Sequence, residues 1–304
     1  MTIYIDGIPS AEAKKLPPEI YNIREEPMQS RKATIILLVS FFIGLSVLLY
    51  PAISSYWNSK TQSEAIVDYE AMLAAYKPED YSDIFEAADE YNAELRKLEI
   101  PLRDCAQLNE MYWETLNVGG TGMMGYITIP KINQELPVYH GTGDAVLSAA
   151  SGHFEGTSLP VGGKSTHSVI SAHRGLPTAV LFTHLDRMEK GDIFYFTILD
   201  RTITYEVDQI HIVEPHDVSL IQMEEGGAYC TLLTCTPYGI NSHRLLVRGQ
   251  QVDASQKRNI YIANEAYRVD PLIVMPIVAL PIIFVLLIYV MIVPVKKEAL
   301  GEGL

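Results

Sequence analysis

The sequence has little cysteine and fewer basic than acidic residues, and both shortages exclude classes of protein. Its 3 cysteines form no Cys-x-x-Cys pair, and it contains no His-Glu-x-x-His run and no Walker-type glycine loop. Metal, dithiol redox and nucleotide sites therefore have no motif to support them, and we expect no cofactor. The 23 basic and 37 acidic residues give a formal charge of -14. Nucleic-acid binding requires a basic surface, so we expect no such partner.

Two long stretches without charged residues lie near the ends of the chain. The first covers residues 33–59, and its apolar part, 33–53, is long enough to cross a bilayer. The second, 271–295, is rich in Ile, Leu and Val. It contains Pro276 and Pro281, which a membrane helix tolerates because neighbouring groups satisfy the freed carbonyls. The sequence therefore predicts two transmembrane helices.

The basic residues that flank these stretches predict their orientation. Arg31 and Lys32 precede the first stretch, and Lys296 and Lys297 follow the second. Positive flanks favour the cytoplasmic side of a membrane. We therefore expect a two-pass protein of the cell membrane, with both termini in the cytoplasm and residues 54–270 outside.

A cleaved signal peptide is the alternative interpretation of the first stretch. Ala52-Ile-Ser54 resembles a cleavage site with small residues. Against cleavage, a long tail precedes the apolar run, and the run exceeds the usual hydrophobic region of a signal peptide. These two features favour a retained helix.

Residues 60–98 have the composition and spacing of helices outside the membrane. Apolar side chains at Ile66, Tyr69 and Leu73 follow helical spacing, and Pro78 stands where a second helix can begin. We predict two helices here. They carry no cluster of residues with chemical function, which favours a structural role.

From Gly119 onward the pattern changes to short alternating apolar segments separated by turn residues. Residues 199–201 separate two of these segments and favour a hairpin. The segments are 124–129, 136–139, 168–172, 193–198, 202–207, 210–213, 229–235 and 244–248. This number of short strands predicts a mainly β domain with a closed or nearly closed barrel.

The odd number of cysteines predicts at least one free thiol. Cys105, Cys230 and Cys235 all lie in the region expected outside the membrane. If Cys230 and Cys235 share a strand, they lie about 16 Å apart on opposite faces and cannot bridge each other. Cys105 is then the one cysteine available to pair with either.

Cys235 is the predicted nucleophile. Thr-Pro-Tyr-Gly follows it and ends the strand, which opens the site, whereas Cys230 lies in mid-strand and is predicted to be a small buried hydrophobe. Idle thiols tend to be oxidised outside the cell, so a free thiol there indicates a working one. The residues alone thus indicate an extracytoplasmic thiol enzyme.

Arg244 lies nine residues after this thiol, at the start of the next apolar segment. A hairpin-like return would bring its guanidinium beside Cys235, where it favours the thiolate and stabilises an oxyanion. The alternative is a surface arginine at the start of a strand.

His173 is the best placed of eight histidines for a general acid and base. It ends the predicted strand 168–172, and strand ends hold catalytic groups firmly while leaving them accessible. Three histidines near the same motifs are predicted to be structural, and four are predicted to lie in loops or on the barrel exterior. The first group is His153, His167 and His243, and the second is His140, His184, His211 and His216.

Residues 231–249, Thr-Leu-Leu-Thr-Cys-Thr-Pro-Tyr-Gly-Ile-Asn-Ser-His-Arg-Leu-Leu-Val-Arg-Gly, resemble the active-site region of class C, pilus-assembling sortases of Gram-positive bacteria. The segments 124–132, 152–163 and 166–177 resemble the same family, and the resemblance covers residues 85–250. A second membrane span is usual in this class. The resemblance implies the eight-stranded sortase barrel.

Carried over by position, the resemblance implies a role for three residues. Cys235 matches the nucleophile, His173 the catalytic histidine and Arg244 the arginine nine residues downstream. The implied reaction is transpeptidation. Cys235 cleaves an LPXTG-like sorting signal between Thr and Gly, and a lysine amine of a second pilin subunit resolves the thioacyl intermediate. The implied partners are pilin subunits and the membrane.

Two other functions stay open from the sequence. A housekeeping-type sortase attaches surface proteins to a cell-wall precursor, so its acceptor is a cross-bridge amine and not a pilin lysine. A membrane scaffold in pilus biogenesis needs no reactive thiol at all. The acceptor separates the first from a class C enzyme, and thiol labelling separates the second.

The chain departs from the family at the lid. Class C enzymes usually carry Asp-Pro-Phe or Asp-Pro-Trp there, whereas this chain has Asp104-Cys105-Ala106. Asp104 is a candidate partner for Arg244. Cys105 either forms a disulfide that locks Cys235 or packs unpaired, and the sequence favours packing.

The predicted organisation has eight parts. They are a cytoplasmic tail (1–32), a transmembrane helix (33–53), an extracellular helical segment (54–98), a lid or linker (99–118), the catalytic barrel (119–252), a linker (253–270), a second transmembrane helix (271–295) and a cytoplasmic tail (296–304).

Overall fold

The computed structural model describes residues 28–253, 279 and 281–284. The chain divides into two compact units, Met1–Leu49 with Asp270–Leu304, and Tyr50–Val269. The second unit holds every predicted site residue. The predicted second membrane span lies almost wholly outside the described residues, so it stays a prediction.

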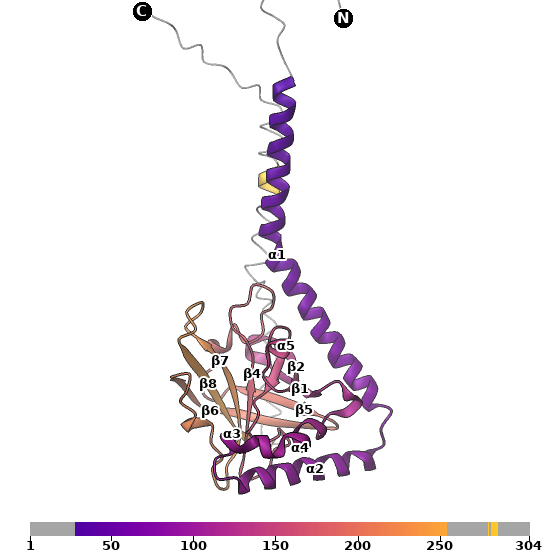
Figure 1. Cartoon of the computed structure of the whole chain (residues 1–304), viewed down its shortest axis with the longest axis vertical. Coiled ribbons are helices and arrows are strands. Elements are labelled where there is room, and N and C mark those ends of the chain that lie inside the picture. Colours follow the sequence, from indigo (N-terminus) through magenta and orange to yellow (C-terminus); the bar gives the residue numbers. More distant parts are fainter. Residues whose placement is uncertain (1–27, 254–278, 280, 285–304) are drawn as a thin grey trace, which may run out of the picture. The chain divides into compact units, whose positions relative to one another are not determined.

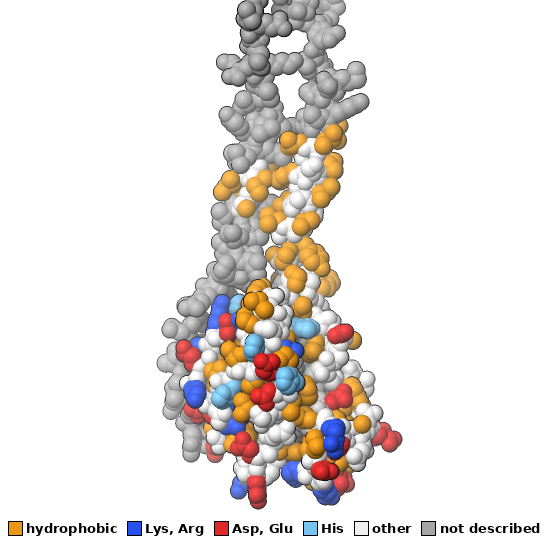
Figure 2. Space-filling view, turned by 60° about the vertical axis from the view of Figure 1, so that its left-hand side comes forward, with side chains coloured by type: hydrophobic (Ala, Val, Ile, Leu, Met, Phe, Trp, Pro, Cys, Tyr) orange, Lys and Arg blue, Asp and Glu red, His pale blue; other side chains and the backbone are white. Residues whose placement is uncertain are grey.

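Helix α1 (Met28–Leu73) is 46 residues long (Figure 1). Within the described part of the chain, its residues Ile35–Leu73 form the one helix that is long and apolar enough to cross a membrane. Figure 2 shows mainly hydrophobic side chains, in orange, along the coloured part of this helix that precedes the barrel. An apolar stretch of this length, whose most hydrophobic part is not buried in the protein, supports membrane anchoring.

The predicted pair of outer helices is half confirmed. Helix α2 (Pro78–Lys97) begins at Pro78, as predicted. The first of the pair is not a separate helix but the continuation of α1 to Leu73. No glycine or proline lies between the apolar span, 33–53, and the amphipathic part of α1, so nothing in this stretch forces the helix to end.

Eight strands close into a barrel in the order β1-β2-β3-β4-β7-β8-β6-β5. The parallel pairs are β2 with β3 and β4 with β7, and the other neighbours are antiparallel. The strands are β1 (Met123–Ile129), β2 (Gln134–His140), β3 (Ser151–His153), β4 (Thr166–Ser171), β5 (Ile193–Ile198), β6 (Arg201–Val213), β7 (Ala228–Thr236) and β8 (His243–Val252). The predicted barrel and the hairpin between β5 and β6 are confirmed.

Two errors in the predicted strands cancel in the total. The segments 202–207 and 210–213 are one strand, β6, whose register against β8 shifts between Val207 and Gln209. The polar residues at this bulge made one strand resemble two. Strand β3 was not predicted, because its three residues are too few to show a period of two.

Short helical turns join these elements. The predicted lid (residues 99–118, called the lid segment below) is built from several of them, in contrast to the irregular stretch that its sequence suggested. The turns of the lid segment and its end are α3 (Pro101–Asp104), η3 (Cys105–Leu108), α4 (Asn109–Glu114) and η4 (Val118–Gly120). The others are η5 (Pro130–Ile132), α5 (Asp144–Leu147), η6 (Leu185–Arg187) and η7 (Ser219–Ile221).

Buried hydrogen bonds attach the helices to the barrel. Tyr69 of α1 donates to Met124 O at 3.0 Å and accepts from Leu199 N at 3.1 Å. Asn92 of α2 accepts from Leu159 N at 2.7 Å and donates to Leu159 O at 3.3 Å. Because each bond satisfies a backbone group that water does not reach, the barrel fixes the positions of both helices.

Buried histidines lie where the lid segment meets the barrel. The Tyr112 hydroxyl contacts His153 Nδ1 at 3.1 Å, and His153 Nε2 lies 2.8 Å from Ser158 O. The structural role predicted for His153 is confirmed. His140 was predicted to lie in a loop or on the exterior, and this was wrong, because it is buried between the carbonyls of Thr115 and Gly122. It follows Tyr139 at the end of β2, where strand alternation turns it inward.

Burial lowers the pKa of His153 to about 3, against 6.5 in an open chain. His153 is therefore neutral in the folded protein. Its effect on the free energy of unfolding is fully favourable above pH 6.5, where the unfolded chain is also unprotonated at this residue. Between pH 6.5 and 3 the unfolded chain binds a proton that the native state does not, which costs up to about 1.4 kcal/mol per pH unit. We expect urea unfolding of the full chain in micelles to show this loss.

The matched variant is His153→Gln, which keeps a donor and an acceptor but does not titrate. Its free energy of unfolding should fall less steeply with pH. Burial also lowers the pKa of His167, so part of the slope remains. If the free energy of unfolding fell equally steeply with pH in the wild type and in His153→Gln, His153 would not be the source of this pH dependence.

Candidate active site

Cys235 lies near the end of β7, on the outer face of the barrel. Along this strand Cys230, Leu232 and Thr234 are buried, while Leu233 and Cys235 are partly exposed. The alternation places Cys235 on the face opposite the core. Pro237, which lacks a backbone N–H, follows Thr236 and ends the strand.

Strand register brings the three predicted catalytic residues together. Cys235 pairs directly with Arg244 across β7 and β8. On the other side, Ser171 of β4 pairs with Leu233 of the parallel strand β7. His173 lies two residues beyond Ser171, past the end of β4, where a continuation of this register would bring it level with Cys235. Cys235 and Arg244, on β7 and β8, and His173, just past the end of β4, are called the catalytic row below.

Hydrogen bonds hold the two flanking members of the row in place. The backbone O of His173 accepts from Phe182 N at 3.1 Å. One residue earlier, Ala172 donates to Leu233 O at 3.2 Å and accepts from the Thr234 hydroxyl at 2.8 Å. Arg244 donates through Nη1 to the carbonyls of Asn241 and His243 at 3.3 and 3.1 Å. The histidine is therefore fixed on a strand end and the guanidinium on the β7–β8 loop.

The other two thiols are poorly suited to nucleophilic attack. Cys230 is fully buried in the barrel, and burial raises the pKa of its thiol strongly. Burial, with the nearby Glu155 carboxylate, also raises the pKa of the Cys105 thiol. Because the thiolate is the reactive form, both are disfavoured as nucleophiles. Cys235, partly exposed at a strand end, is the remaining candidate.

The predicted contacts of the lid residues differ from those in the structure. Asp104 pairs with Arg103, at 2.7 Å from its Nε, and not with Arg244. This neighbour lowers the pKa of the Asp104 carboxyl. All three cysteines are free in this structure, and Cys105 packs against the main core, as the favoured alternative has it. Two adjacent residues can pair without the entropy cost of closing a loop, which favours Arg103 over the distant Arg244 as the partner of Asp104.

The lid segment reaches the apolar surface next to the catalytic row. Leu102 packs in a cluster with Val169, Leu233 and Leu246, three residues of β4, β7 and β8. Leu233 and Leu246 are paired and lie one row before Cys235 and Arg244 on the same face. The aromatic plug usual in the family is thus replaced by a leucine two residues before the Asp104 position.

A glycine allows this close approach. At Gly156 a Cβ atom would lie 2.9 Å from Leu102 Cα and 3.3 Å from Cys105 Sγ. Its φ of +81° also disfavours other residues. The lid segment therefore packs backbone to backbone on the β3–β4 loop.

Arg174 was not predicted, although it directly follows His173. Its side chain is buried and donates to the Thr236 hydroxyl at 3.2 Å and to Asp186 at 2.6 Å. Nε is buried without a hydrogen-bond partner in the described part of the chain. Arg174 thus joins the ends of β4 and β7, one residue from His173 and one from Cys235. Only its proximity to the histidine marked it in the sequence.

We expect Arg174→Lys to slow acylation of Cys235 about tenfold, because loss of a charged hydrogen bond costs about 1.5 kcal/mol or more. Single-turnover cleavage of a sorting-signal peptide measures the rate. Arg187→Lys, at an exposed position in the same connection, is the control and should leave the rate unchanged. A wild-type rate in Arg174→Lys would remove the residue from the site.

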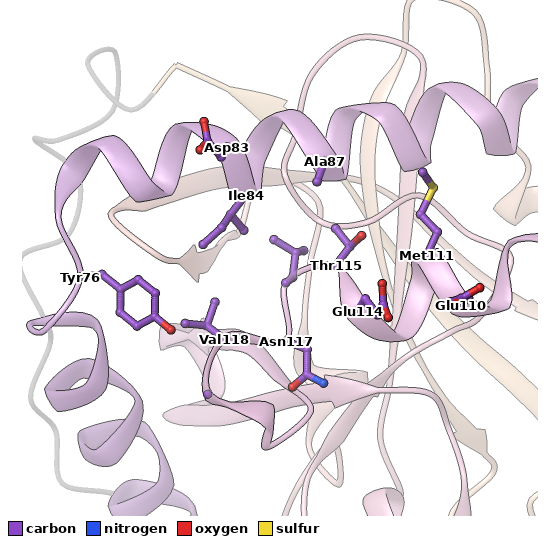
Figure 3. Close-up of a pocket in the computed structure, with 12 residues that line it drawn as sticks. Tyr76, Asp83, Ile84, Ala87, Glu110, Met111, Glu114, Thr115, Asn117 and Val118 are labelled. Atoms are coloured by element: carbon purple, nitrogen blue, oxygen red, sulfur yellow. The ribbon is translucent and has the colours of Figure 1, made fainter.

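A separate cavity of about 680 Å³ lies between α2 and the lid segment (Figure 3). Its lining includes Ile84, Met111 and Val118, with the carboxylates of Asp83 and Glu114 beside them. None of the catalytic row lines it. The cavity and the predicted catalytic residues therefore lie in different places. We take the catalytic row, and not the cavity, as the candidate active site.

Comparison with known proteins agrees with this geometry. The family model described as a Sortase domain matches residues 127–252. The crystal structure of sortase C1 from Streptococcus agalactiae is 47% identical, with a TM-score of 0.59, and the match covers 62% of this chain and 98% of that one. Streptococcus pneumoniae sortase C is 44% identical, with a TM-score of 0.56 and coverage of 62% and 97%.

A third solved structure is that of Clostridium perfringens sortase C with the C-terminal cell wall sorting motif. It is 40% identical, with a TM-score of 0.55, and the match covers 63% of this chain and 99% of that one. Among curated proteins, Sortase D of Bacillus subtilis is 30% identical and Sortase A of Streptococcus agalactiae 32% identical. These matches span 42% and 38% of this chain, and 63% and 47% of the curated relatives' own lengths.

Proposed function

This chain belongs to the sortase family, and we propose that it is a membrane-anchored cysteine transpeptidase of class C. We propose that it cleaves an LPXTG-like sorting signal between Thr and Gly. It then joins the threonine carbonyl to a lysine amine of another pilin subunit. The observation that supports this proposal is the pairing of Cys235 with Arg244 across β7 and β8, with His173 two residues beyond the end of the neighbouring strand β4.

The structural relatives support the choice of substrate. The Streptococcus pneumoniae enzyme is described in terms of pilin substrate specificity, and the Clostridium perfringens enzyme was solved with a cell wall sorting motif. Both are more than a third identical to this chain over nearly their whole lengths. The apolar cluster of Val169, Leu233 and Leu246, on which Leu102 packs, would offer a place for the Leu-Pro side chains of such a signal once the lid segment moves away.

In the first half-reaction the Cys235 thiolate attacks the threonine carbonyl carbon, and an S–C bond forms. The Thr–Gly C–N bond then breaks, and His173 donates a proton to the leaving glycine amine. The product is a thioester on Cys235. Arg244 faces the thiol across the strand pair, where its guanidinium stabilises the negative charge on the carbonyl oxygen.

In the second half-reaction a lysine amine attacks the thioester. Neutral His173 takes the proton that the amine releases, the C–S bond breaks, and Cys235 leaves as a thiolate. An isopeptide bond joins the two subunits. The enzyme returns to its starting protonation state, so no external reductant or cofactor is needed for balance.

We propose a two-pass topology for the whole chain. Helix α1 supplies the first span, at residues 33–53, and residues 271–295 supply the second. Basic residues lie between each span and the nearer end of the chain. This arrangement supports cytoplasmic termini and an extracellular barrel. The lid segment then regulates access to the site from outside the cell.

The decisive experiment incubates the full chain, in micelles, with a sorting-signal peptide and a pilin domain that supplies a lysine. Mass spectrometry should find the thioester on Cys235 and then an isopeptide-linked product. Cys235→Ala should form neither. A product with a cross-bridge amine but none with lysine would identify a housekeeping-type enzyme instead.

A vinyl sulfone that reacts with thiols tests the scaffold alternative. Selective labelling of Cys235 over Cys105 and Cys230 is expected, because burial raises the pKa values of the latter two. An unreactive Cys235 would favour a scaffold.

A further inference from the structure

Exposed large apolar side chains of the barrel gather at one end. Among the described residues of the barrel, Ile212, Tyr238 and Ile240 are 63%, 60% and 72% exposed, and Val218 is 39% exposed. Ile212 pairs with Leu245 near the end of β6, one position from Arg244. Tyr238 and Ile240 belong to the β7–β8 loop that follows Cys235. All lie at the end of the barrel that carries the catalytic row or in the loop that leaves it.

This loop has a defined shape. The N–H groups of Ile240 and Asn241 both donate to Pro237 O, at 3.1 and 2.9 Å. Tyr238 packs on Gly175, where a Cβ atom would meet the tyrosine ring at 3.0 Å. These contacts hold the loop in one shape. The side chains of Tyr238 and Ile240 therefore stay exposed to solvent. In Figure 1 this turn is the orange loop beyond the ends of β7 and β8.

Helix α1 is attached to the same end of the barrel. Asn58 donates to Thr178 O at 2.8 Å, and Gln62 donates to Ala149 O at 2.6 Å. Thr178 lies in the connection that begins at His173 and contains Gly175, the residue under Tyr238. A short series of contacts thus links the helix, the connection after His173 and the β7–β8 loop.

Asn58, which attaches α1 to the barrel, directly follows residues that are typical of a membrane interface. Tyr50, Tyr56 and Trp57 are exposed, and Trp57 directly precedes Asn58. Tyrosine and tryptophan concentrate at the headgroup level of a bilayer. With a helical rise of about 1.5 Å per residue, Asn58 is within one turn of that level. The barrel end bound to Asn58 is therefore close to the headgroups.

We propose that the apolar end formed by Ile212, Tyr238 and Ile240 rests in the headgroup layer of the outer leaflet, as a second membrane attachment beside α1. Such apolar groups gain by leaving water and need no protein partner there. Glu214 and Asp217 lie beside Ile212 in the sequence, so the attraction is apolar and not electrostatic. The contact sets the height of Cys235 over the membrane.

Fluorescence quenching by brominated lipid tests the contact in the full chain, reconstituted in phosphatidylcholine vesicles. The sequence has 2 tryptophans, Trp57 and Trp113, and both are changed to Phe in the background. Ile240→Trp then reports on the loop. Glu225→Trp, an exposed position just before the opposite end of β7, is the matched control. A protein that keeps Trp57 alone gives the reference for the interface.

We expect Ile240→Trp to be quenched at least threefold more than Glu225→Trp and about as much as the Trp57 reference. Addition of salt should leave the quenching unchanged. Equal, weak quenching at the two introduced positions would overturn the proposal. Quenching that salt removes would overturn its apolar basis.

The competing occupant of this surface is the peptide substrate. In that case Ile240→Ser should raise KM for a soluble sorting-signal peptide about tenfold, and the lipid quenching should be absent. Membrane contact predicts a KM within twofold of the wild type. The quenching measurement needs no turnover, so a negative result leaves the proposed transpeptidase activity standing.

Discussion

Arg244→Lys should lose about a hundredfold to a thousandfold of the rate of thioester formation, although the positive charge remains. This is the range lost when one donor to a developing oxyanion is removed. The guanidinium is planar and presents parallel N–H groups, so it holds a carbonyl oxygen while Nη1 stays bonded to the loop carbonyls of Asn241 and His243. A lysine ammonium has one nitrogen and cannot do both.

Two measurements separate positioning from activation of the thiol. Single-turnover cleavage of the sorting-signal peptide gives the rate of acylation, and vinyl sulfone labelling gives the reactivity of Cys235. We expect the first to fall and the second to change less than threefold, because a cation still lies next to the thiol. Near wild-type acylation in Arg244→Lys would count against bidentate positioning.

The pairing of Cys235 with Arg244 could be predicted because the pairing of β7 with β8 is local. Cys235 and Arg244 are joined by a single short loop, so their pairing follows from the apolar segments on either side. His173 follows the short apolar strand β4 by two residues. The resemblance to a family added the roles of the three residues. The pairing of Cys235 with Arg244 follows from register, whereas the position of His173 depends also on the non-local pairing of β4 with β7.

Other features depend on contacts that no local pattern records. The side chain of Arg174 crosses from β4 to the end of β7, and the parallel β4–β7 pairing that allows this joins distant segments. His140 appeared polar and exposed, but carbonyls from two other segments enclose it. The resemblance to the family favours Arg244 as the partner of Asp104, but Asp104 pairs with its neighbour Arg103.

Leu102→Ala should open the lid segment and speed the reaction of Cys235 with a vinyl sulfone about tenfold to a hundredfold. Leu102 is the residue of the lid segment that packs in the cluster of Val169, Leu233 and Leu246. Removing most of a packed leucine side chain costs about 1.5–3 kcal/mol. If the closed lid protects the thiol, this loss converts into the same factor in the open population.

Ile100→Ala is the matched control, since Ile100 lies in the same segment but is exposed. It should label at the wild-type rate. Urea unfolding of both variants should show that the barrel itself is intact, because Leu102 lies outside the main barrel core. Equal labelling rates in Leu102→Ala and the wild type would mean that the lid segment does not shield Cys235. Cys235 would then be open to the sorting signal at all times.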